Sequence, residues 1–324
     1  MSRCHYVYVG DPNNHDNHHS ALTIGRKVYW MLRGMFSEVI YYDWADIRNI
    51  PQIDSDDIII GHPNYHTQTP IRQLFRNNVK YKALIFPLHT KIHTDNWPFN
   101  DLVNQADDIF SIQGPYWYDT LPHTMFKNWQ PKITRLDMAI DCDLWKYVKT
   151  EFNDIGNRGI VYIGNDTANK NLNLLYKIAE AMPNQRFEWY GGYSEHILGR
   201  LQNVKIYGQS DIFNMASEIC MKNDFIISTS ISDANPGTLS EIGLASGLIP
   251  LCTPQSGYYE NDHFANITLD VNDSINIINK WLHIPSETLK QKSINTRKMC
   301  ESQFTWDIFL DKIREKLKKY ASIS

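Results

Sequence analysis

The feature that most constrains this chain is the alternation of short apolar runs with amphipathic helical patterns along its whole length. Runs that are apolar at nearly every position are typical of parallel strands covered by helices on both faces. We expect strands at 4–10, 38–44, 57–63, 83–89, 108–114, 159–164, 186–191, 204–208, 224–230 and 248–253. The sequence therefore predicts an α/β fold with two Rossmann-like, doubly wound parallel sheets, one in each half.

Helical patterns separate these strands, with apolar residues at three- and four-residue intervals. They are clearest over 21–36, 69–77, 171–182 and 212–223. A chain of 324 residues is too long for one ordinary core, and the polar stretch 149–159 is expected to join two domains. Ligands of open parallel sheets bind beyond the carboxyl ends of the strands, so the expected site is a central cleft between the domains.

The composition narrows the class of protein. A net charge of −4 gives no overall positive field for binding nucleic acid. Five cysteines, an odd number without a CxxC pair, indicate a reducing, cytoplasmic environment. We expect no signal peptide and no membrane-spanning segment. Basic residues in 22–35 and near the C-terminus leave open a peripheral location at the inner face of a membrane.

Two loops of the second half carry candidate chemistry. The first, GNDTANKN (164–171), follows a predicted strand and opens a helix. Lys170 then lies beside a helix N-terminus, where backbone N–H groups already favour an anion such as a phosphate. The alternative is a solvated lysine in a polar loop.

The second loop, DANPGTLSEIGLASG (233–247), follows the strand predicted at 224–230. Pro236 and Gly237 predict a turn, and Gly237 lets a ligand approach the backbone closely. Glu241 and Thr238 match a capping box, so spacing alone leaves Glu241 evenly divided between helix capping and ligand binding. Asp233 has no obvious helix to cap.

Taken in order, these motifs resemble the C-terminal domain of retaining glycosyltransferases of the GT-B fold, the family 4-like group (glycosyl transferases group 1). That group carries an acid, seven residues and a glutamate, the separation of Asp233 and Glu241. Its Gly-Arg, four residues, Lys motif corresponds to 164–170. The end of the chain, FTWDIFLDKIREKLKKY, resembles the group's terminal helix. The resemblance covers about residues 130–324.

The resemblance implies a GT-B architecture with 1–150 on the acceptor side and 151–303 on the nucleotide-sugar donor side. Residues 304–324 would form a terminal helix that crosses back to the first domain. The implied activity is retaining, metal-independent transfer of a hexosyl group from a nucleoside-diphosphate sugar. The acceptor would be a glycan, a lipid-linked molecule or a small molecule, as in polysaccharide biosynthesis.

The resemblance also implies roles for single residues. Glu241 would hold the ribose hydroxyls, and Asp233 would contact hydroxyls of the transferred sugar. Lys170, with the backbone around Pro236, Gly237 and Thr238, would neutralise the diphosphate leaving group, so we expect no metal and no other cofactor. His89, after the strand predicted at 83–89, would face the sugar from the first domain.

Two residues depart from the family pattern. Asn165 stands where the family usually has arginine, and a neutral amide does not replace a bidentate guanidinium contact. The first acid is an aspartate, Asp233, in place of the usual glutamate, which bears on the sugar preference.

The loop after the first predicted strand, GDPNNHDNHHSA (10–21), is rich in polar side chains. We expect Asn14, His15 and His18 to face the cleft and contact the acceptor or donor. Three histidines on one Asn-rich loop without second-shell partners are weak grounds for a metal site.

Two other functions fit the same sequence. One is a nucleotide-sugar epimerase of the same fold, which needs acid and base carboxylates from the first domain. The other is a non-catalytic nucleotide-sugar-binding partner protein, for which Asn165 is the main argument.

Overall fold

The computed structural model describes residues 2–15, 20–45, 50–64, 69–87, 99–123, 125–192, 198–235 and 237–321. The chain forms two compact units. The first comprises Met1–Ile112, Thr120–Leu136 and Trp306–Ser324, and the second comprises Gln113–Asp119 and Asp137–Thr305.

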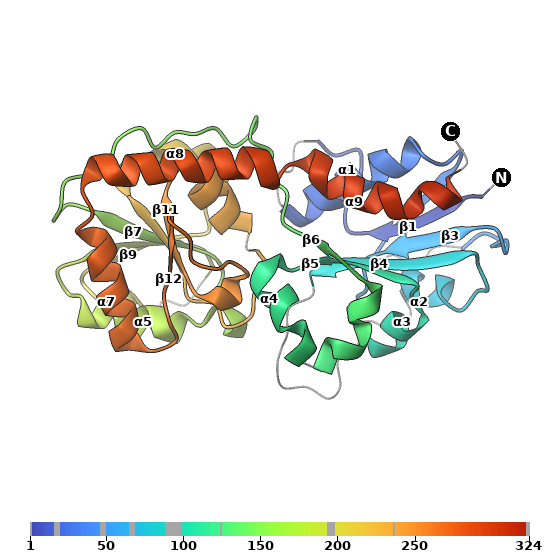
Figure 1. Cartoon of the computed structure of the whole chain (residues 1–324), viewed down its shortest axis with the longest axis horizontal. Helices are drawn as coiled ribbons and strands as arrows, with labels where there is room; N and C mark the ends of the chain where they lie inside the picture. The colour runs from blue at the N-terminus through green and yellow to red at the C-terminus, as the bar shows by residue number, and fades with distance from the viewer. Residues whose placement is uncertain are drawn as a thin grey trace. The chain divides into compact units, whose positions relative to one another are not determined.

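The first unit is built on a parallel sheet with strand order β2-β1-β3-β4-β5-β6. Its strands are β1 (Cys4–Tyr8), β2 (Val39–Asp43), β3 (Ile58–Gly61), β4 (Tyr81–Pro87), β5 (Asp108–Ile112) and β6 (Ile133–Leu136). Its helices are α1 (Ser20–Arg33), α2 (Pro70–Leu74), α3 (Asn100–Gln105) and α9 (Trp306–Leu317), with 3-10 turns at Leu121–His123, Met125–Lys132 and Lys318–Tyr320. Helices α1 and α9 cover one face of the sheet, and α2 and α3 the other (Figure 1).

The second unit carries a parallel sheet with strand order β12-β11-β10-β7-β8-β9. Its strands are β7 (Gly159–Ile163), β8 (Arg186–Tyr190), β9 (Val204–Gly208), β10 (Phe225–Ser228), β11 (Ile249–Cys252) and β12 (Ala265–Asn266). Its α-helices are α5 (Leu172–Ala181), α6 (Ile212–Lys222), α7 (Val271–Leu282) and α8 (Ser286–Gln303), and most of α4 (Gly114–Thr120) belongs to this unit. Short helical turns are η3 (Ala168–Lys170), η4 (Leu198–Arg200), the π-helix η5 (Leu239–Ala245) and η6 (Pro254–Ser256).

This order is the Rossmann arrangement, in which the direction of chain progression reverses between two neighbouring strands. Here those strands are β7 and β10, which pair through Phe225 with Ile160 and Ile226 with Val161. A crevice opens beyond the carboxyl ends of strands at such a reversal. The loops after β7 and β10 therefore lie together at this edge of the sheet, although more than sixty residues separate them in sequence.

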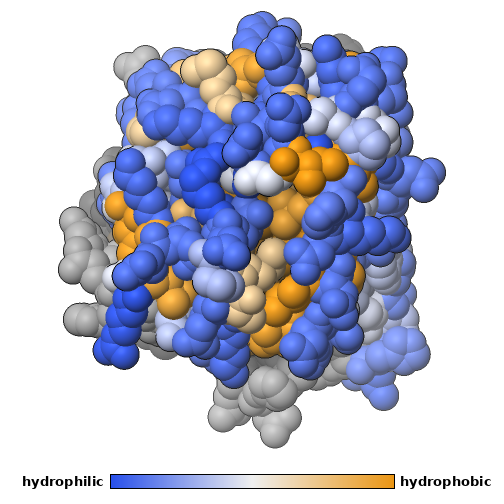
Figure 2. All heavy atoms as spheres, turned by 90° about the vertical axis from the view of Figure 1, so that its left-hand side faces the viewer, coloured by the Kyte–Doolittle hydropathy of each residue, from blue (hydrophilic) through white to orange (hydrophobic). Residues whose placement is uncertain are grey.

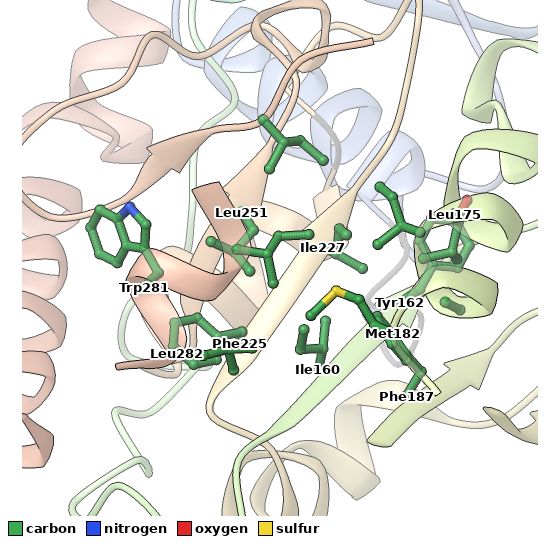
Figure 3. Packing of buried hydrophobic residues seen from close by; sticks show 14 of the residues in the cluster. Ile160, Tyr162, Leu175, Met182, Phe187, Phe225, Ile227, Leu251, Trp281 and Leu282 are labelled. Carbon is green, nitrogen blue, oxygen red and sulfur yellow. The ribbon is translucent and has the colours of Figure 1, made fainter. Parts of the chain in front are cut away.

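Two hydrophobic clusters hold the second sheet between its helices. On one face, side chains of β7, β8, β10 and β11 pack against α5 and α7; Figure 3 shows Ile160, Phe225 and Ile227 of the sheet with Leu175 of α5 and Trp281 of α7. The other face packs against α6, η5 and α8. Burial on both faces explains why these strands are apolar at almost every position.

The surface of the second unit has a different composition from its core. Figure 2 shows the side that lies at the left of Figure 1, where hydrophilic residues dominate and hydrophobic residues form small patches between them. No helix of the described segments is long and apolar enough to cross a membrane.

All ten predicted strands are present, some of them shorter than expected. Two further strands, β6 and β12, were not predicted. In β6 the two middle residues, Thr134 and Arg135, are only partly buried, and β12 has two residues. Neither has the continuous apolar run on which the prediction depends.

Candidate functional site

A cavity of about 260 Å³ lies beyond the carboxyl ends of β7, β8 and β9 in the second unit. Its lining residues come from the last residues of β7 and β8, from the loops after β7, β8 and β9, from the start of α6 and from Thr238; they are Ile163, Gly164, Asn165, Tyr190, Gly191, Gln209, Ser210, Ile212 and Thr238. The cavity adjoins the point where strand order reverses, which is where this fold binds ligands. Both apolar and hydrogen-bonding side chains line it, as in small-molecule sites.

A second, smaller cavity lies deeper, between β7 and β10. It is lined by Tyr162, Ile163, Lys170, Ile226, Ile227, Ser228, Thr238 and Leu239. Its volume of about 10 Å³ is room for roughly one water molecule. Thr238 lines both cavities, and Lys170 is the single cation among their described lining residues.

The structure brings Lys170 and Asp233 together. The Lys170 ammonium donates to Oδ2 of Asp233 and forms an ion pair with it. Both side chains keep some solvent contact, with exposures of 23% and 14%. The residue expected at the diphosphate and the residue expected at the sugar therefore occupy one site, and they neutralise each other there.

Local backbone contacts hold Lys170 in place. Its carbonyl accepts a hydrogen bond from the Thr229 hydroxyl at 2.9 Å, which ties the loop after β7 to the end of β10. Ile231 N donates to Asn169 O at 2.8 Å between the same two loops. Asn171, next in the chain, adopts the left-handed conformation (φ 52°) and starts α5. This short-range geometry turns the chain from η3 into the helix directly after Lys170.

Asp233 is held by its own loop and by α4. Its Oδ1 accepts from Ala234 N at 3.0 Å, and its backbone N donates to Gln255 O at 2.9 Å. The indole Nε1 of Trp117 donates to the carbonyl oxygens of Asp233 (2.5 Å) and Gln255 (3.0 Å). Trp117 is 2% exposed. Sequence reasoning missed it, because no local pattern links a tryptophan in α4 to a loop 116 residues later.

Glu241 lies in the π-helix η5, and burial raises the pKa of its carboxyl from 4.5 to about 8. Among the described residues, none donates a hydrogen bond to this carboxylate. A π-turn is rare and is frequently found at functional sites. Glu241 is therefore a half-buried acid without a hydrogen-bond partner among the described residues, in the helix that starts next to Thr238.

The capping box predicted for Thr238 and Glu241 is absent. The Thr238 hydroxyl donates to the carbonyl of Ile163 at 3.1 Å, and no side-chain bond caps the helix at Thr238. Thr238 thus joins the start of η5 to the end of β7. Gly237 directly precedes it, and Pro236 lies outside the described residues.

Asn165, at the position where the family that the sequence resembles usually has arginine, has a structural partner. Its Oδ1 accepts a hydrogen bond from Gly192 N at 3.1 Å, which links the loop after β7 to the loop after β8. This amide shapes the wall of the larger cavity. It adds no positive charge there.

Two further residues of the site were not singled out from the sequence. The Tyr162 hydroxyl is buried without a hydrogen-bond partner among the described residues, and burial raises its pKa. Ser228, at the end of β10, shares a buried hydroxyl cluster with Ser256, at 2.8 Å between their oxygens, and with Ser230. The position of Tyr162 one residue before the end of a strand was the available signal.

The candidates of the first unit stay predictions. Asn14 and His15 follow β1 and are exposed; the Asn14 carbonyl accepts from Arg26 at 2.5 Å. His18 and His89 lie outside the described residues. Within the described segments, no group of three or more histidine, cysteine or acidic side chains could hold a metal ion.

No protein-family model and no curated protein matches this sequence. Solved structures do share its fold. A glycosyltransferase from Rickettsia africae is 14% identical and superposes with a TM-score of 0.69, over 100% of this chain and 99% of the other. Anabaena HepE in complex with UDP and glucose is 13% identical, with a TM-score of 0.65 over 98% and 100%.

A third similar structure is from E. coli, described as trehalose-6-phosphate bound with UDP-2-fluoro glucose. It is 10% identical and has a TM-score of 0.71 over 98% of this chain and 99% of the other. At such identities the likeness establishes the fold. The prediction of a GT-B, α/β architecture with two parallel sheets is confirmed.

Proposed function

We propose that this chain is a glycosyltransferase that uses a nucleoside-diphosphate sugar, with a uridine nucleotide as the first candidate. One observation carries the proposal. A cavity of about 260 Å³ at the carboxyl edge of the second sheet shares Thr238 with a smaller cavity lined by Lys170, and Lys170 forms an ion pair with Asp233. Similar folds from Anabaena are complexes with UDP and with UDP-glucose, which supports the choice of base.

In the proposed complex, the larger cavity takes the nucleoside and Lys170 takes the diphosphate. Transfer of the sugar leaves negative charge on the phosphate oxygens, and a preorganised cation stabilises that charge most in the transition state. The backbone at Gly237 and Thr238, with Pro236 before them, adds N–H donors on the same side. The lysine replaces a metal ion in this scheme, so the reaction needs none.

Asp233 exchanges its partner when the donor binds. In the structure its carboxylate neutralises Lys170. A bound diphosphate takes over the ammonium and leaves the carboxylate to accept hydrogen bonds from sugar hydroxyls. Asp233 is then the residue that distinguishes a nucleotide-sugar from the bare nucleotide.

Glu241 is the proposed partner of the ribose hydroxyls. A carboxyl with a pKa of about 8 is largely protonated at neutral pH, so it can both donate and accept a hydrogen bond. A ribose diol offers the complementary donors and acceptors. Binding would give this acid a hydrogen-bond partner, which none of the described residues provides.

The finer parts of the proposal concern the first unit and the outcome of the reaction. Transfer proceeds with retention, and His89 and the loop with Asn14, His15 and His18 face the donor or the acceptor. The acceptor is a glycan, a lipid-linked molecule or a small molecule of polysaccharide biosynthesis. The protein works in the cytoplasm, with peripheral contact to a membrane for a lipid-linked acceptor.

A non-catalytic nucleotide-sugar-binding protein is the second candidate. The observation that favours it is the engagement of Asn165 with Gly192, which leaves Lys170 as the single cation lining the described cavities. Both candidates bind the donor, and only the enzyme turns it over.

Thermal stabilisation by UDP-, GDP-, ADP- and dTDP-sugars tests donor binding, because a ligand that binds the native state raises the unfolding midpoint. Release of the nucleoside diphosphate from the donor that binds, measured with a panel of acceptors, tests turnover. Lys170→Ala should abolish both responses. Lys177→Ala, on the exposed side of α5, is the matched control and should retain them.

Stabilisation by no nucleotide-sugar would refute the proposal. Stabilisation without turnover on any acceptor would favour the non-catalytic protein.

A further inference from the structure

Two thiols of the second unit lie next to each other outside the candidate site. Cys142 Sγ is 3.4 Å from Cys300 Sγ, although 158 residues separate them in sequence. Cys142 follows β6 and is partly exposed, whereas Cys300 is on α8 and fully buried. All five cysteines are free, and the other three are buried.

Hydrogen bonds on both sides of the two thiols fasten the segment around Cys142 to α8. Arg297, one turn before Cys300 on α8, donates from Nη2 to the carbonyl of Cys142 at 2.6 Å and from Nη1 to that of Trp145 at 2.5 Å. On the other side, Ile140 N donates to Phe304 O at 2.8 Å. The segment around Cys142 is thus fastened to α8 before and after the sulfur pair, so the two sulfurs stay close.

The surroundings also make the two thiols unequal. The hydrogen bond from Cys300 and the charge of Arg297 lower the pKa of Cys142, and the same sulfur contact with burial raises the pKa of Cys300. Burial raises the pKa of Cys220 and Cys252 to about 12. Because the thiolate is the reactive form, Cys142 is the favoured nucleophile among these four.

We propose that Cys142 and Cys300 form a reversible disulfide when the protein meets a peroxide. The Cys142 thiolate attacks one oxygen of hydrogen peroxide, the O–O bond breaks, and the leaving hydroxide takes up a proton to form water. The resulting sulfenic acid is attacked by the sulfur of Cys300, which forms the S–S bond and releases the second water. Two thiols and one peroxide thus give one disulfide and two waters.

The disulfide would cross-link two segments of the second unit. It would join α8 covalently to the segment that enters this unit after Leu136, and it would close a loop of more than 150 residues. Cross-links of long loops restrict the unfolded chain more than the native one. Oxidation should therefore raise the thermal midpoint without displacing either segment. This inference does not depend on the proposed function.

The experiment treats the reduced full-length chain with a small excess of hydrogen peroxide, blocks the remaining thiols with N-ethylmaleimide, and analyses intact mass and linked peptides. The expected product retains three blocked thiols and contains a peptide pair joining Cys142 to Cys300. Dithiothreitol should restore five blocked thiols and return the thermal midpoint to that of the untreated chain.

Cys142→Ser and Cys300→Ser should each lack the linked pair, and Cys220→Ser, a buried cysteine of α6, is the matched control that should retain it. If Cys300→Ser fails to fold, the peptide map of the wild-type chain still decides. A Cys142 that is oxidised only to sulfinic acid, a link between two chains, or five thiols that remain free would each overturn the proposal.

Discussion

Lys170 and Asp233 form an ion pair between two loops that follow neighbouring strands of the second sheet. Each residue was predicted to face a different part of one ligand, and in the structure the two side chains face each other. In the proposed complex a diphosphate would therefore compete with Asp233 for the ammonium. Because of this competition, the contributions of the two side chains to ligand binding can be measured separately.

Asp233→Asn should bind UDP more tightly and lose its preference for UDP-glucose over UDP. Removing the carboxylate frees Lys170 for the phosphates, and a partly exposed ion pair is worth up to about 1 kcal/mol, or roughly fivefold in the dissociation constant. Isothermal titration with both ligands measures the two effects. Asp273→Asn, an exposed acid in α7, is the control. Equal losses for UDP and UDP-glucose would contradict the role assigned to Asp233.

Glu241→Gln should change how stability depends on pH. Burial raises the pKa of Glu241 from 4.5 to about 8, so between these values the folded state holds a proton that the unfolded chain has released. The free energy of unfolding of the wild type therefore has a contribution that falls as pH rises from about 4.5 to about 8 and is level above. The glutamine variant lacks this contribution. Its free energy of unfolding should therefore rise relative to that of the wild type as pH increases across that range.

Thermal midpoints of the two proteins at several pH values test this, with Glu287→Gln on the exposed start of α8 as control. Parallel profiles for Glu241→Gln and the wild type would show that the carboxyl ionises normally in the folded state.

Asn165→Arg should strengthen UDP binding. A guanidinium at this position adds a cation to the lining of the larger cavity, whereas Lys170 lines the smaller one. A charge-assisted hydrogen bond to phosphate contributes about 1.5–3 kcal/mol, roughly tenfold or more in affinity. The variant also loses the bond from Gly192 N to Asn165 Oδ1. Asn165→Ala loses the same hydrogen bond without adding a charge, so its UDP affinity measures the effect of that loss alone. A weaker affinity for Asn165→Arg than for Asn165→Ala would show that the cavity has no room for an arginine.

Trp117→Phe should lower the thermal midpoint and weaken UDP-glucose binding. Phenylalanine keeps an aromatic ring and removes the N–H that serves the carbonyls of Asp233 and Gln255. The Gln255 carbonyl keeps its bond from Asp233 N, whereas the Asp233 carbonyl loses this donor, at a cost of about 1–3 kcal/mol. Trp281→Phe, a buried tryptophan of α7 remote from this loop in sequence, is the control for the loss of ring volume. If both substitutions changed the thermal midpoint and UDP-glucose binding equally, the Trp117 indole N–H would have no specific role.

Much of the fold could be predicted because strand and helix patterns are local. The runs around Ile160, Phe225 and Ile249 are apolar on both faces, and only a covered parallel sheet accommodates that pattern. The same reasoning failed for β6 and β12, where half-buried residues or a length of two leave no such pattern. The paired cysteines, 158 residues apart, also left no sign in the sequence.

By itself the sequence determined two parallel sheets, their division between the halves of the chain, and the loops whose polar residues follow strands. Tertiary structure alone decided which of those residues meet. Because β7 lies beside β10, Lys170 pairs with Asp233 and the Thr238 hydroxyl donates to the end of β7 instead of capping its own helix. Local patterns encode burial and conformation, whereas strand order sets long-range neighbours, and no short stretch of this chain contains that order.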